Sequence, residues 1–431
     1  MSESVSDQAG AQASPPEPSA FALSYGGFRL YWAARFLTAF AIQVLSVSVA
    51  WRIYVITRDP FLLGLVGLVQ FTPSLLLVLV TGTVADRFNR RRIMATCLAV
   101  EAACALVLLF MLTGADAAAG RIWPVFVVLA VFGIARAFMG PVIQSLVANL
   151  VPPIALPSAV AFNSSSFQLA SIAGPVAGGL LYGVSPVVAY ATAVGFFVAA
   201  SAMTLAIPKP ARRTLPPPVT TDSLLAGFRF IWSNPIVLGG MSLDLVAVLL
   251  GGATALLPVF ARDVLETGPW GLGALRSAAG IGALSVSIWL MRRPIRDHAG
   301  RAMLAAVVLF GIAITVFGMS KSVWLSVGAL AVMGGADMIS VFVRQTLIQL
   351  HTPDEVRGRV SAVNMTFIGA SNELGEFRAG TMAALIGAVP AVIVGGIGTV
   401  AAALTWSRLF PELASVRRLD RIAIGKGNGS G

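Results

Sequence analysis

Charge is scarce in this sequence. Only 11% of its 431 residues are Asp, Glu, Lys or Arg, against about 25% in soluble domains, and 57% are hydrophobic. Cysteine and histidine are scarcer still, with two of each, so neither a disulfide framework nor a metal site is expected. The first twenty residues contain three acids and no base, so no cleaved signal peptide is expected. These scarcities argue against a water-soluble globular protein.

Long apolar runs are the dominant feature of the chain. Between charged or Pro/Gly-rich breaks they extend over about 20 to 25 residues, long enough for a helix to cross a hydrocarbon core of about 30 Å. The chain is therefore predicted to be an all-α membrane protein with twelve transmembrane helices. The expected spans are 30–56, 61–84, 93–113, 122–149, 156–182, 186–207, 236–260, 270–290, 301–319, 323–350, 360–387 and 390–409.

Basic residues are distributed unequally between alternate breaks. One set of breaks, which includes the C-terminal tail, holds eighteen Lys and Arg residues, and the other set holds four. Because cytoplasmic loops carry the excess of basic residues, both termini are expected in the cytoplasm. The net charge of +11 is explained by these loops. Their position favours membrane retention and contact with anionic lipids over nucleic-acid binding.

A polar stretch divides the spans six and six. Residues 208–235 form the longest polar break and are rich in proline and basic residues. The expected organisation is a disordered cytoplasmic N-terminal tail at 1–27, a six-helix bundle at 28–207, a cytoplasmic linker at 208–235, a second six-helix bundle at 236–410 and a cytoplasmic tail at 411–431.

The two halves show an internal repeat. A shift of 201 residues aligns 133–179 with 334–380 and gives ten identities in 47 positions, among them Asn163 with Asn364. An even number of spans in each half preserves the direction of the chain. The halves are therefore expected to be parallel repeats related by an axis along the membrane normal, with a site near the midplane.

One loop motif resembles the signature of the major facilitator superfamily. The sequence GTVADRFNRRRIM, at the end of the second span, carries the resemblance. The family has Gly where Asn89 stands here, and Asn tolerates the left-handed conformation of a tight turn. The matching residues are Gly82, Ala85, Asp86, Arg87, Arg90 and Arg91.

The loop motif has two interpretations. In the gating interpretation, Asp86 faces a helix N-terminus or a basic partner such as Arg357 or Arg359 across the interface between the halves, while the arginines of the motif reach lipid phosphates. In the alternative interpretation, the motif is a positive-inside anchor without a gating role.

Two further motifs fall in the expected order. GIARAFMGP in span four resembles a second motif of the superfamily through Arg136 and Gly140, and ASIAGPVAGG in span five resembles its antiporter motif, although a glycine-rich helix alone would indicate only close packing. The stretches 244–265 and 357–376 resemble the branch that contains bacterial enterobactin exporters and macrolide efflux proteins. Substrate identity does not follow from that resemblance. The antiporter residues are Gly174, Pro175, Gly178 and Gly179.

Ionisable side chains inside the spans are candidate functional residues, because each costs at least a few kcal/mol in lipid without a partner or a wet cavity. The repeat places Asp337 opposite Arg136 and Asp244 opposite Gln43. In the superfamily spans one, four, seven and ten line the central cavity, so all four residues are expected to face the translocation path. Asp244 and Asp337 would then carry a proton beside Arg136. The alternative is a static ion pair between Arg136 and Asp337.

Other charged residues follow helical spacing. Arg344 lies two helical turns after Asp337, so that face of span ten is expected to be wet or paired. Glu373 and Glu376 share one face of span eleven, which makes one of them a candidate proton carrier unless Arg378 neutralises it.

Three charged residues have no evident role in the sequence. Glu101 lies mid-span without a visible partner and is expected to be a buried, protonated acid. Arg35 and Arg276 lie nearer the ends of spans and are expected to extend toward the interface.

The predicted function is that of a secondary active transporter for proton-coupled efflux, by antiport, of a small amphiphilic molecule such as a drug or siderophore. The alternatives are an importer of a small metabolite and a sensor or scaffold without transport. An enzyme is disfavoured because both histidines lie in expected loops and no nucleophile with a base is evident. The expected partners are the substrate, protons and membrane lipids, with no cofactor, metal or nucleic acid. The protein is expected to be a monomer in the bacterial cytoplasmic (inner) membrane.

Overall fold

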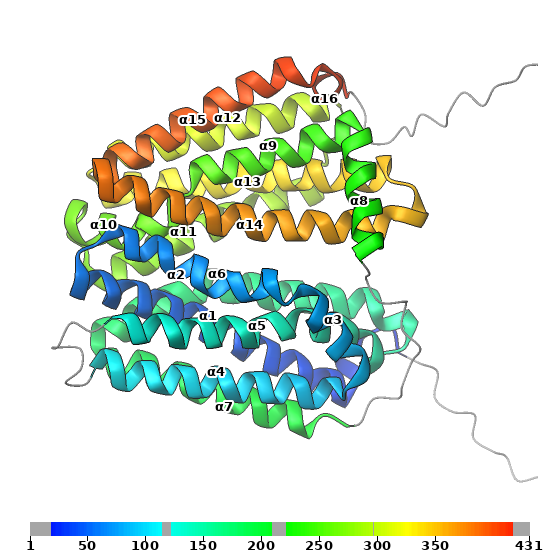
Figure 1. Cartoon of the computed structure of the whole chain (residues 1–431), viewed down its shortest axis with the longest axis vertical. Helices are drawn as coiled ribbons and strands as arrows, with labels where there is room; N and C mark the ends of the chain where they lie inside the picture. Colours follow the sequence, from blue (N-terminus) through cyan, green and yellow to red (C-terminus); the bar gives the residue numbers. More distant parts are fainter. Residues whose placement is uncertain (1–18, 114–121, 209–220, 296, 417–431) are drawn as a thin grey trace, which may run out of the picture.

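The computed structural model describes residues 19–113, 122–208, 221–295 and 297–416, and its regular elements are helices (Figure 1). Most of the proposed N-terminal tail and of the C-terminal tail lie outside these ranges. Two helical bundles lie one above the other, with their long helices running in roughly the same direction across the view (Figure 1). Helices satisfy every backbone polar group internally, as lipid requires.

The first bundle accounts for the first six expected spans. The second span is divided between two helices, α2 and α3, that meet at Leu77. Pro73 lies one turn before this break, and proline both lacks a backbone donor and clashes with the preceding turn. The helices are α1 (Gly26–Thr57), α2 (Pro60–Leu76), α3 (Val78–Arg87), α4 (Arg90–Thr113), α5 (Trp123–Leu150), α6 (Leu156–Val184) and α7 (Pro186–Ala206).

The second bundle accounts for the remaining six expected spans. The seventh expected span is not the continuous helix that the sequence predicts, because α9 ends at Gly251 and the chain continues through short 3-10, α and π segments to Val264. The elements are α9 (Pro235–Gly251), η4 (Thr254–Leu256), α10 (Leu257–Val259), η5 (Phe260–Val264), α11 (Gly268–Arg292), α12 (Ala299–Met319), α13 (Val323–His351), α14 (Asp354–Ile386), α15 (Ala388–Leu409) and α16 (Pro411–Ser415).

Ten of the twelve expected spans correspond to single helices, the second to a pair of helices and the seventh to α9 with the short segments after it, which confirms the predicted all-α architecture of two six-helix bundles. Ten stretches of the described chain are long and apolar enough to cross a bilayer, and one of them, Pro235–Val264, includes α9 and the short segments that follow it. The helix α14 is not among them, and it carries Glu373, Glu376 and Arg378 in its centre. Its polarity indicates that this helix faces protein or water along much of its length.

An additional helix lies inside the stretch expected to be a linker. The helix α8 (Thr221–Ser233) crosses the ends of the second bundle (Figure 1) and packs against α14 and α9. Its Gly227 allows the close approach, since a Cβ there would lie 3.0 Å from the carbonyl carbon of Arg359. We call this end of the molecule the α8 end and the opposite end, which carries α10, the α10 end.

The bundles contact each other mainly through α6 with α11 and α2 with α14. Both contacts use glycine. A Cβ on Gly179 of α6 would lie 3.2 Å from the Cα of Gly273, and a Cβ on Gly64 of α2 would lie 2.9 Å from the Cα of Phe377. Small residues let helix backbones approach closely in membranes. These glycines lie in the halves of their helices nearer the α10 end, so the bundles are joined there.

Candidate functional site

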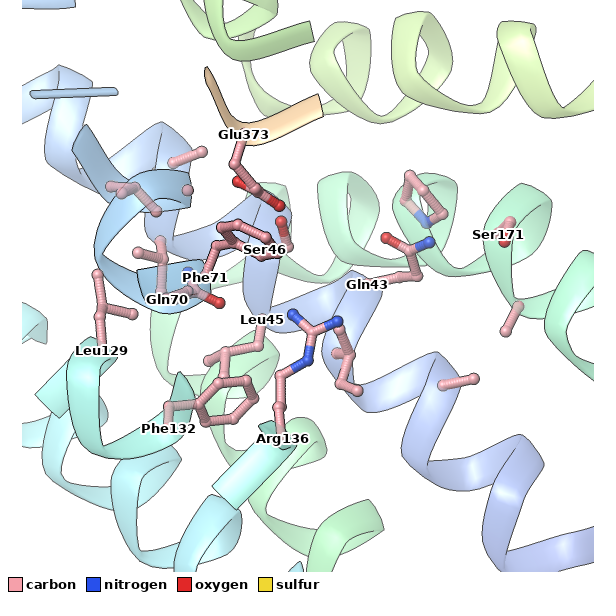
Figure 2. A pocket seen from close by; sticks show the side chains of 18 of the residues that line it. Gln43, Leu45, Ser46, Gln70, Phe71, Leu129, Phe132, Arg136, Ser171 and Glu373 are labelled. Carbon is pink, nitrogen blue, oxygen red and sulfur yellow. The ribbon is translucent and has the colours of Figure 1, made fainter. Parts of the chain in front are cut away.

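A cavity of about 680 Å³ lies between the two bundles. Helices α1, α2, α4, α5 and α6 line it from the first bundle, and η4, α11 and α14 line it from the second. Figure 2 shows side chains converging on this space from opposite walls. Its charged residues are Arg35, Glu101, Arg136, Arg276, Glu373 and Glu376.

The second bundle contributes two acids to this cavity. Glu373 and Glu376 project from α14 toward α2, where a Cβ on Gly67 would lie 3.4 Å from Oε2 of Glu376. Arg276 of α11 crosses the interface instead of extending toward the membrane surface, and its guanidinium donates a hydrogen bond to Ser46 Oγ of α1 at 2.7 Å. The prediction that Arg276 extends toward the interface is therefore wrong, since its side chain points into the cavity and is hydrogen-bonded across the bundles.

The first bundle contributes a mixed wall. Arg136 projects from α5 into the cavity opposite Glu373, and the two are close enough to interact electrostatically (Figure 2). Glu101 of α4 is 1% exposed and interacts in the same way with Arg136 and Arg35. The sequence indicates no partner for Glu101 because helix contacts decide which of its neighbours approach it. Arg35 is predicted from the sequence to extend toward the membrane interface, but it lines the cavity instead.

Uncharged polar and aromatic side chains complete the lining. Gln43 lies on α1 against α6, where a Cβ on Gly174 would lie 2.6 Å from its Cβ. Phe71, Phe132 and Phe167 also line the cavity. Apolar and aromatic walls with a few convergent polar groups are typical of small-molecule sites.

A second cluster of charges lies inside the second bundle. Asp244 of α9 and Arg344 of α13 form an ion pair of 2.6 Å between Oδ2 and a guanidinium nitrogen, with side chains 7% and 3% exposed. Asp337 and Ser340 of α13 line a void of about 10 Å³ beside Asp244. These residues are separate from the residues that line the central cavity. Asp244 and Asp337 therefore do not face the central cavity with Gln43 and Arg136 as the repeat predicts, whereas Arg344 is paired, one of the two outcomes expected for its face of span ten.

The pairing of charges explains why these residues lie inside the second bundle. The Arg136–Asp337 ion pair that the sequence leaves open is not formed in the described residues, and Arg344 takes the carboxylate of Asp244 as its partner. An unpaired buried charge is costly, so α9 and α13 pack with their charged faces together. Alignment of the repeats indicates depth in the membrane but not which way each helix face turns.

Arg378 does not have the role that the sequence suggests, which is to neutralise Glu373 or Glu376. Its guanidinium donates hydrogen bonds to the carbonyl of Leu250 and to Met382 Sδ, the latter at 2.8 Å. It thereby caps the C-terminal end of α9 at the break, where a cation is favourable. Among the described contacts it is not a partner of Glu373 or Glu376.

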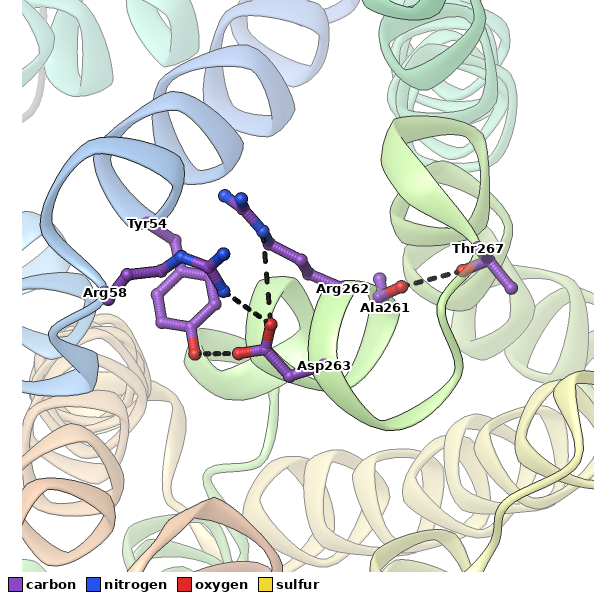
Figure 3. Close-up of polar contacts among 6 residues, drawn as sticks. All are labelled: Tyr54, Arg58, Ala261, Arg262, Asp263 and Thr267. Carbon is purple, nitrogen blue, oxygen red and sulfur yellow. Dashed lines mark hydrogen bonds and ion pairs between the residues drawn. The ribbon is translucent and has the colours of Figure 1, made fainter.

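Residues at the α10 end join the bundles through one carboxylate. Tyr54 Oη of α1 donates to Oδ2 of Asp263 in η5, and Arg58 contacts Oδ1 at 2.7 Å (Figure 3). Arg262 lies 4.0 Å from the same oxygen. We call Tyr54, Arg58 and Asp263 the Asp263 latch. The sequence alone does not predict this latch. A signal is present, because Arg58 is one of only four basic residues in the breaks on the side that is poor in basic residues.

The arginines of the loop motif are held by backbone carbonyls. Arg90 donates to the carbonyl of Ala85 at 3.3 Å, and Arg91 donates to that of Ile207 at 2.5 Å. The sequence suggests a tight turn with Asn89 in the left-handed conformation, but Asn89 does not adopt that conformation. Its side chain instead accepts a hydrogen bond from the backbone N–H of Arg91 at 3.1 Å, which satisfies a free donor at the start of α4.

Gly82 and Arg87 show no contact across the bundles within the described structure. Gly82 lies within α3 and has open space around it, and Arg87 is exposed at the end of that helix. The side chain of Asp86 lies outside the described structure. Arg357, considered as its partner, forms an ion pair of 2.5 Å with Asp354 of its own helix.

The antiporter motif packs α6 on two sides. A Cβ on Gly178 would lie 3.0 Å from the Cα of Val44 in α1, while Gly179 faces α11 across the interface between the bundles. Pro175 lies within α6, and its carbonyl oxygen faces Gly273. The motif therefore joins α1, α6 and α11 at close range beside the cavity.

The two bundles and the cavity between them have the architecture of major facilitator superfamily transporters. The chain is similar to the structure of a bacterial homologue of the human lysosomal transporter Spinster, in an inward-facing and unoccupied conformation, with a TM-score of 0.68 at 14% identity over 90% of this chain and 97% of that one. It is similar to a D-xylose–proton symporter with a TM-score of 0.67 at 12% identity, over 90% and 98% of the two chains.

The chain belongs to the transmembrane secretion effector family, whose sequence model matches residues 18–423. It is 25% identical to the enterobactin exporter EntS of Citrobacter koseri over 400 residues, which cover 92% of this chain and 94% of that protein. It is 24% identical to EntS of Shigella boydii over 380 residues, which cover 87% and 89%. These similarities support a membrane transporter of small molecules.

Proposed function

We propose that this protein is a secondary active exporter that works by alternating access. The observation that carries the proposal is the charged cavity of about 680 Å³, which both bundles line and which lies beside their glycine contacts. A site between two bundles can open to either side when one bundle moves against the other. The names of the EntS relatives favour export over import.

The substrate that fits this cavity is a small amphiphilic molecule, such as a siderophore or a drug. Phe71, Phe132 and Phe167 offer apolar contact, while Arg136 and Glu373 offer groups of opposite charge on facing walls. We assign Gln43 to the same path because it lines the cavity. Enterobactin enters this proposal as a candidate because the relatives are named for it.

The coupling ion in this proposal is a proton, exchanged for the substrate and carried by Glu373 and Glu376. Both acids line the cavity, with Arg136 and Arg276 near enough to balance them. One proton moving down 100 mV supplies about 2.3 kcal/mol. Asp244 and Arg344, which pair away from the cavity, brace the second bundle in this scheme, and Asp337 lies beside them.

The orientation that we propose places both termini and the α8 end in the cytoplasm, in a bacterial inner membrane. The excess of basic loop residues lies at that end. The Asp263 latch and the glycine contacts then close the outer side, so the structure corresponds to an inward-facing state. Antiport by one chain requires no second copy, and we propose a monomer.

Inverted membrane vesicles test the transport proposal. Vesicles from cells that produce the full chain are energised to an acidic interior and supplied with enterobactin or with ethidium as probes. We expect accumulation of at least one probe that stops when the pH gradient is collapsed. Glu376→Gln should abolish coupled accumulation, while Glu355→Gln, the same change at an exposed site on α14, should not.

Three results would each count against a part of the proposal. Accumulation that persists without the pH gradient would remove proton coupling, and failure of both probes in vesicles shown to hold folded protein would remove the proposed substrate class. Equal activity of the Glu376→Gln and Glu355→Gln variants would remove the assignment of the proton site while leaving transport in place.

A further inference from the structure

A second large hollow lies on the outside of the first bundle. It has a volume of about 580 Å³ and runs between α4 and α5. Along most of its length the walls are apolar, with Val100 on one side and Val131, Ile134 and Phe138 on the other. We call it the α4/α5 groove. The stretch from Arg92 to Val100 follows α4 for about 12 Å, at 1.5 Å per residue.

The groove faces away from the central cavity. Val131 and Ile134 are 40% and 41% exposed, and both lie on the outer surface of α5. Ile134 and Arg136 are two positions apart, or about 200° around a helix, so the residue that lines the groove and the residue that lines the cavity occupy opposite faces. In a membrane protein the surface outside the bundle contacts lipid, so lipid has direct access to this groove.

One end of the groove is cationic. Among the three consecutive arginines that open α4, Arg90 and Arg91 donate to backbone carbonyls. Arg92 is exposed at the mouth of the groove and has no hydrogen bond or ion pair within the described residues. Asn89 lies beside it at the start of the helix. The groove therefore combines an apolar channel with a free guanidinium at its end.

We propose that the α4/α5 groove binds an anionic phospholipid. One acyl chain lies along Val100, Val131 and Ile134, and the headgroup phosphate contacts Arg92 beside the N-terminus of α4. Oriented backbone donors and the helix dipole favour an anion at that position. The pattern fits a lipid better than a free anion, because a free anion would leave the apolar channel uncovered.

A lipid in this groove would affect the transport site because it would set the positions of two helices that line the central cavity. The same two helices carry Glu101 and Arg136 on their cavity faces. A chain seated between α4 and α5 fixes the separation of these helices, and therefore the separation of the two side chains. Lipid binding itself does not depend on the proposed transport function and is measured without it.

Native mass spectrometry of the full chain tests this inference, with phosphatidylglycerol and phosphatidylcholine as probes added to delipidated protein in detergent. We expect Arg92→Gln to weaken the tightest-bound phosphatidylglycerol about fivefold, as one basic residue near an anionic headgroup predicts, and to leave phosphatidylcholine unchanged. Ile134→Trp fills the groove at a lipid-exposed position and should weaken both lipids. Arg301→Gln removes the same charge from an exposed site at the start of α12 and should change neither.

Several outcomes would overturn the inference. Equal binding of phosphatidylglycerol by the Arg92→Gln and Arg301→Gln variants would show that the headgroup lies elsewhere. Unchanged binding in the Ile134→Trp variant would show that no acyl chain occupies the groove. Displacement of phosphatidylglycerol by an equal concentration of glycerol phosphate would identify a free-anion site in place of a lipid site.

Discussion

The protein contains two groups of charges inside the membrane, and they differ in their surroundings. In the central cavity, three basic and three acidic residues from both bundles line an open space of about 680 Å³. In the second bundle, Asp244 and Arg344 contact each other directly at 2.6 Å, beside a void of only about 10 Å³. The first arrangement has room for a ligand. The second has no room for anything larger than a water molecule.

The difference indicates that a charge inside a span is not by itself a transport residue. Both groups satisfy the requirement that intramembrane charges have partners or a cavity. Only the cavity residues come from both bundles, so only their surroundings change when the bundles move. Four substitutions test this distinction, with the largest effect expected at the buried pair and the smallest at Ser340.

The largest effect is expected at the buried pair. Arg344→Gln leaves the carboxylate of Asp244 without its partner, and removal of one member of a buried ion pair costs about 3–5 kcal/mol. We expect the free energy of unfolding in detergent to fall by that amount, measured by denaturant titration. The double variant Asp244→Leu with Arg344→Leu should recover most of the loss, since no charge is then left unpaired. Failure of the double variant to recover would show that the loss does not come from an unpaired charge.

A smaller and different effect is expected in the cavity. Arg136→Gln should reduce transport roughly tenfold, equivalent to about 1.4 kcal/mol, while the free energy of unfolding stays nearly constant because the side chain faces open space. Vesicle uptake and denaturant titration on the same preparation separate the two quantities. A variant that unfolds as easily as Arg344→Gln would erase the distinction between the two groups.

The Asp263 latch tests whether a partly exposed contact between the bundles holds the α10 end closed. Tyr54→Phe removes one hydrogen bond to a carboxylate, at a cost of about 1.5–3 kcal/mol if the bond is fully formed in only one state. Because the side chain of Asp263 is 37% exposed, we expect the low end of that range. The measurement is labelling of a cysteine introduced at Ser46 by a reagent added from outside, which should increase. Unchanged labelling would show that the latch does not hold this end closed.

The smallest effect is expected at Ser340. Its hydroxyl is buried without a hydrogen-bond partner in the described residues, so Ser340→Ala removes a polar group that gains nothing from its site. Stability should stay the same or rise by less than about 1 kcal/mol. A clear loss of transport in this variant, with the fold intact, would assign the buried cluster a role in coupling.

Sequence reasoning predicted the fold well because membrane helices depend on long apolar runs and little else. It could not predict the break after Gly251, since glycines occur throughout these helices and only the packing of the adjacent Gly252 against Gly375 of α14 gives this site a consequence. The helix α8 was hidden in a polar stretch whose partner, α14, lies more than a hundred residues away.

The candidate site was predictable in part. The sequence indicates which charges lie inside the membrane, and Arg136, Glu373 and Glu376 do reach the cavity. It does not indicate how each helix is rotated about its axis. That rotation placed Asp244 and Asp337 inside a bundle and placed Arg276 against Ser46 across the interface. The Asp263 latch depends on residues that are distant in sequence and unremarkable locally.

Where Gly179 meets Pro269 and Gly273, the seam between α6 and α11 brings backbone against backbone. Two helices whose side chains interlock must first withdraw those side chains before they can slide or tilt. At these glycines no side chain has to withdraw, so in the proposed alternating access this part of the seam would serve as the pivot. A single added methyl group at Gly179 would then affect the rate of reorientation more than the depth or chemistry of the chamber beside it.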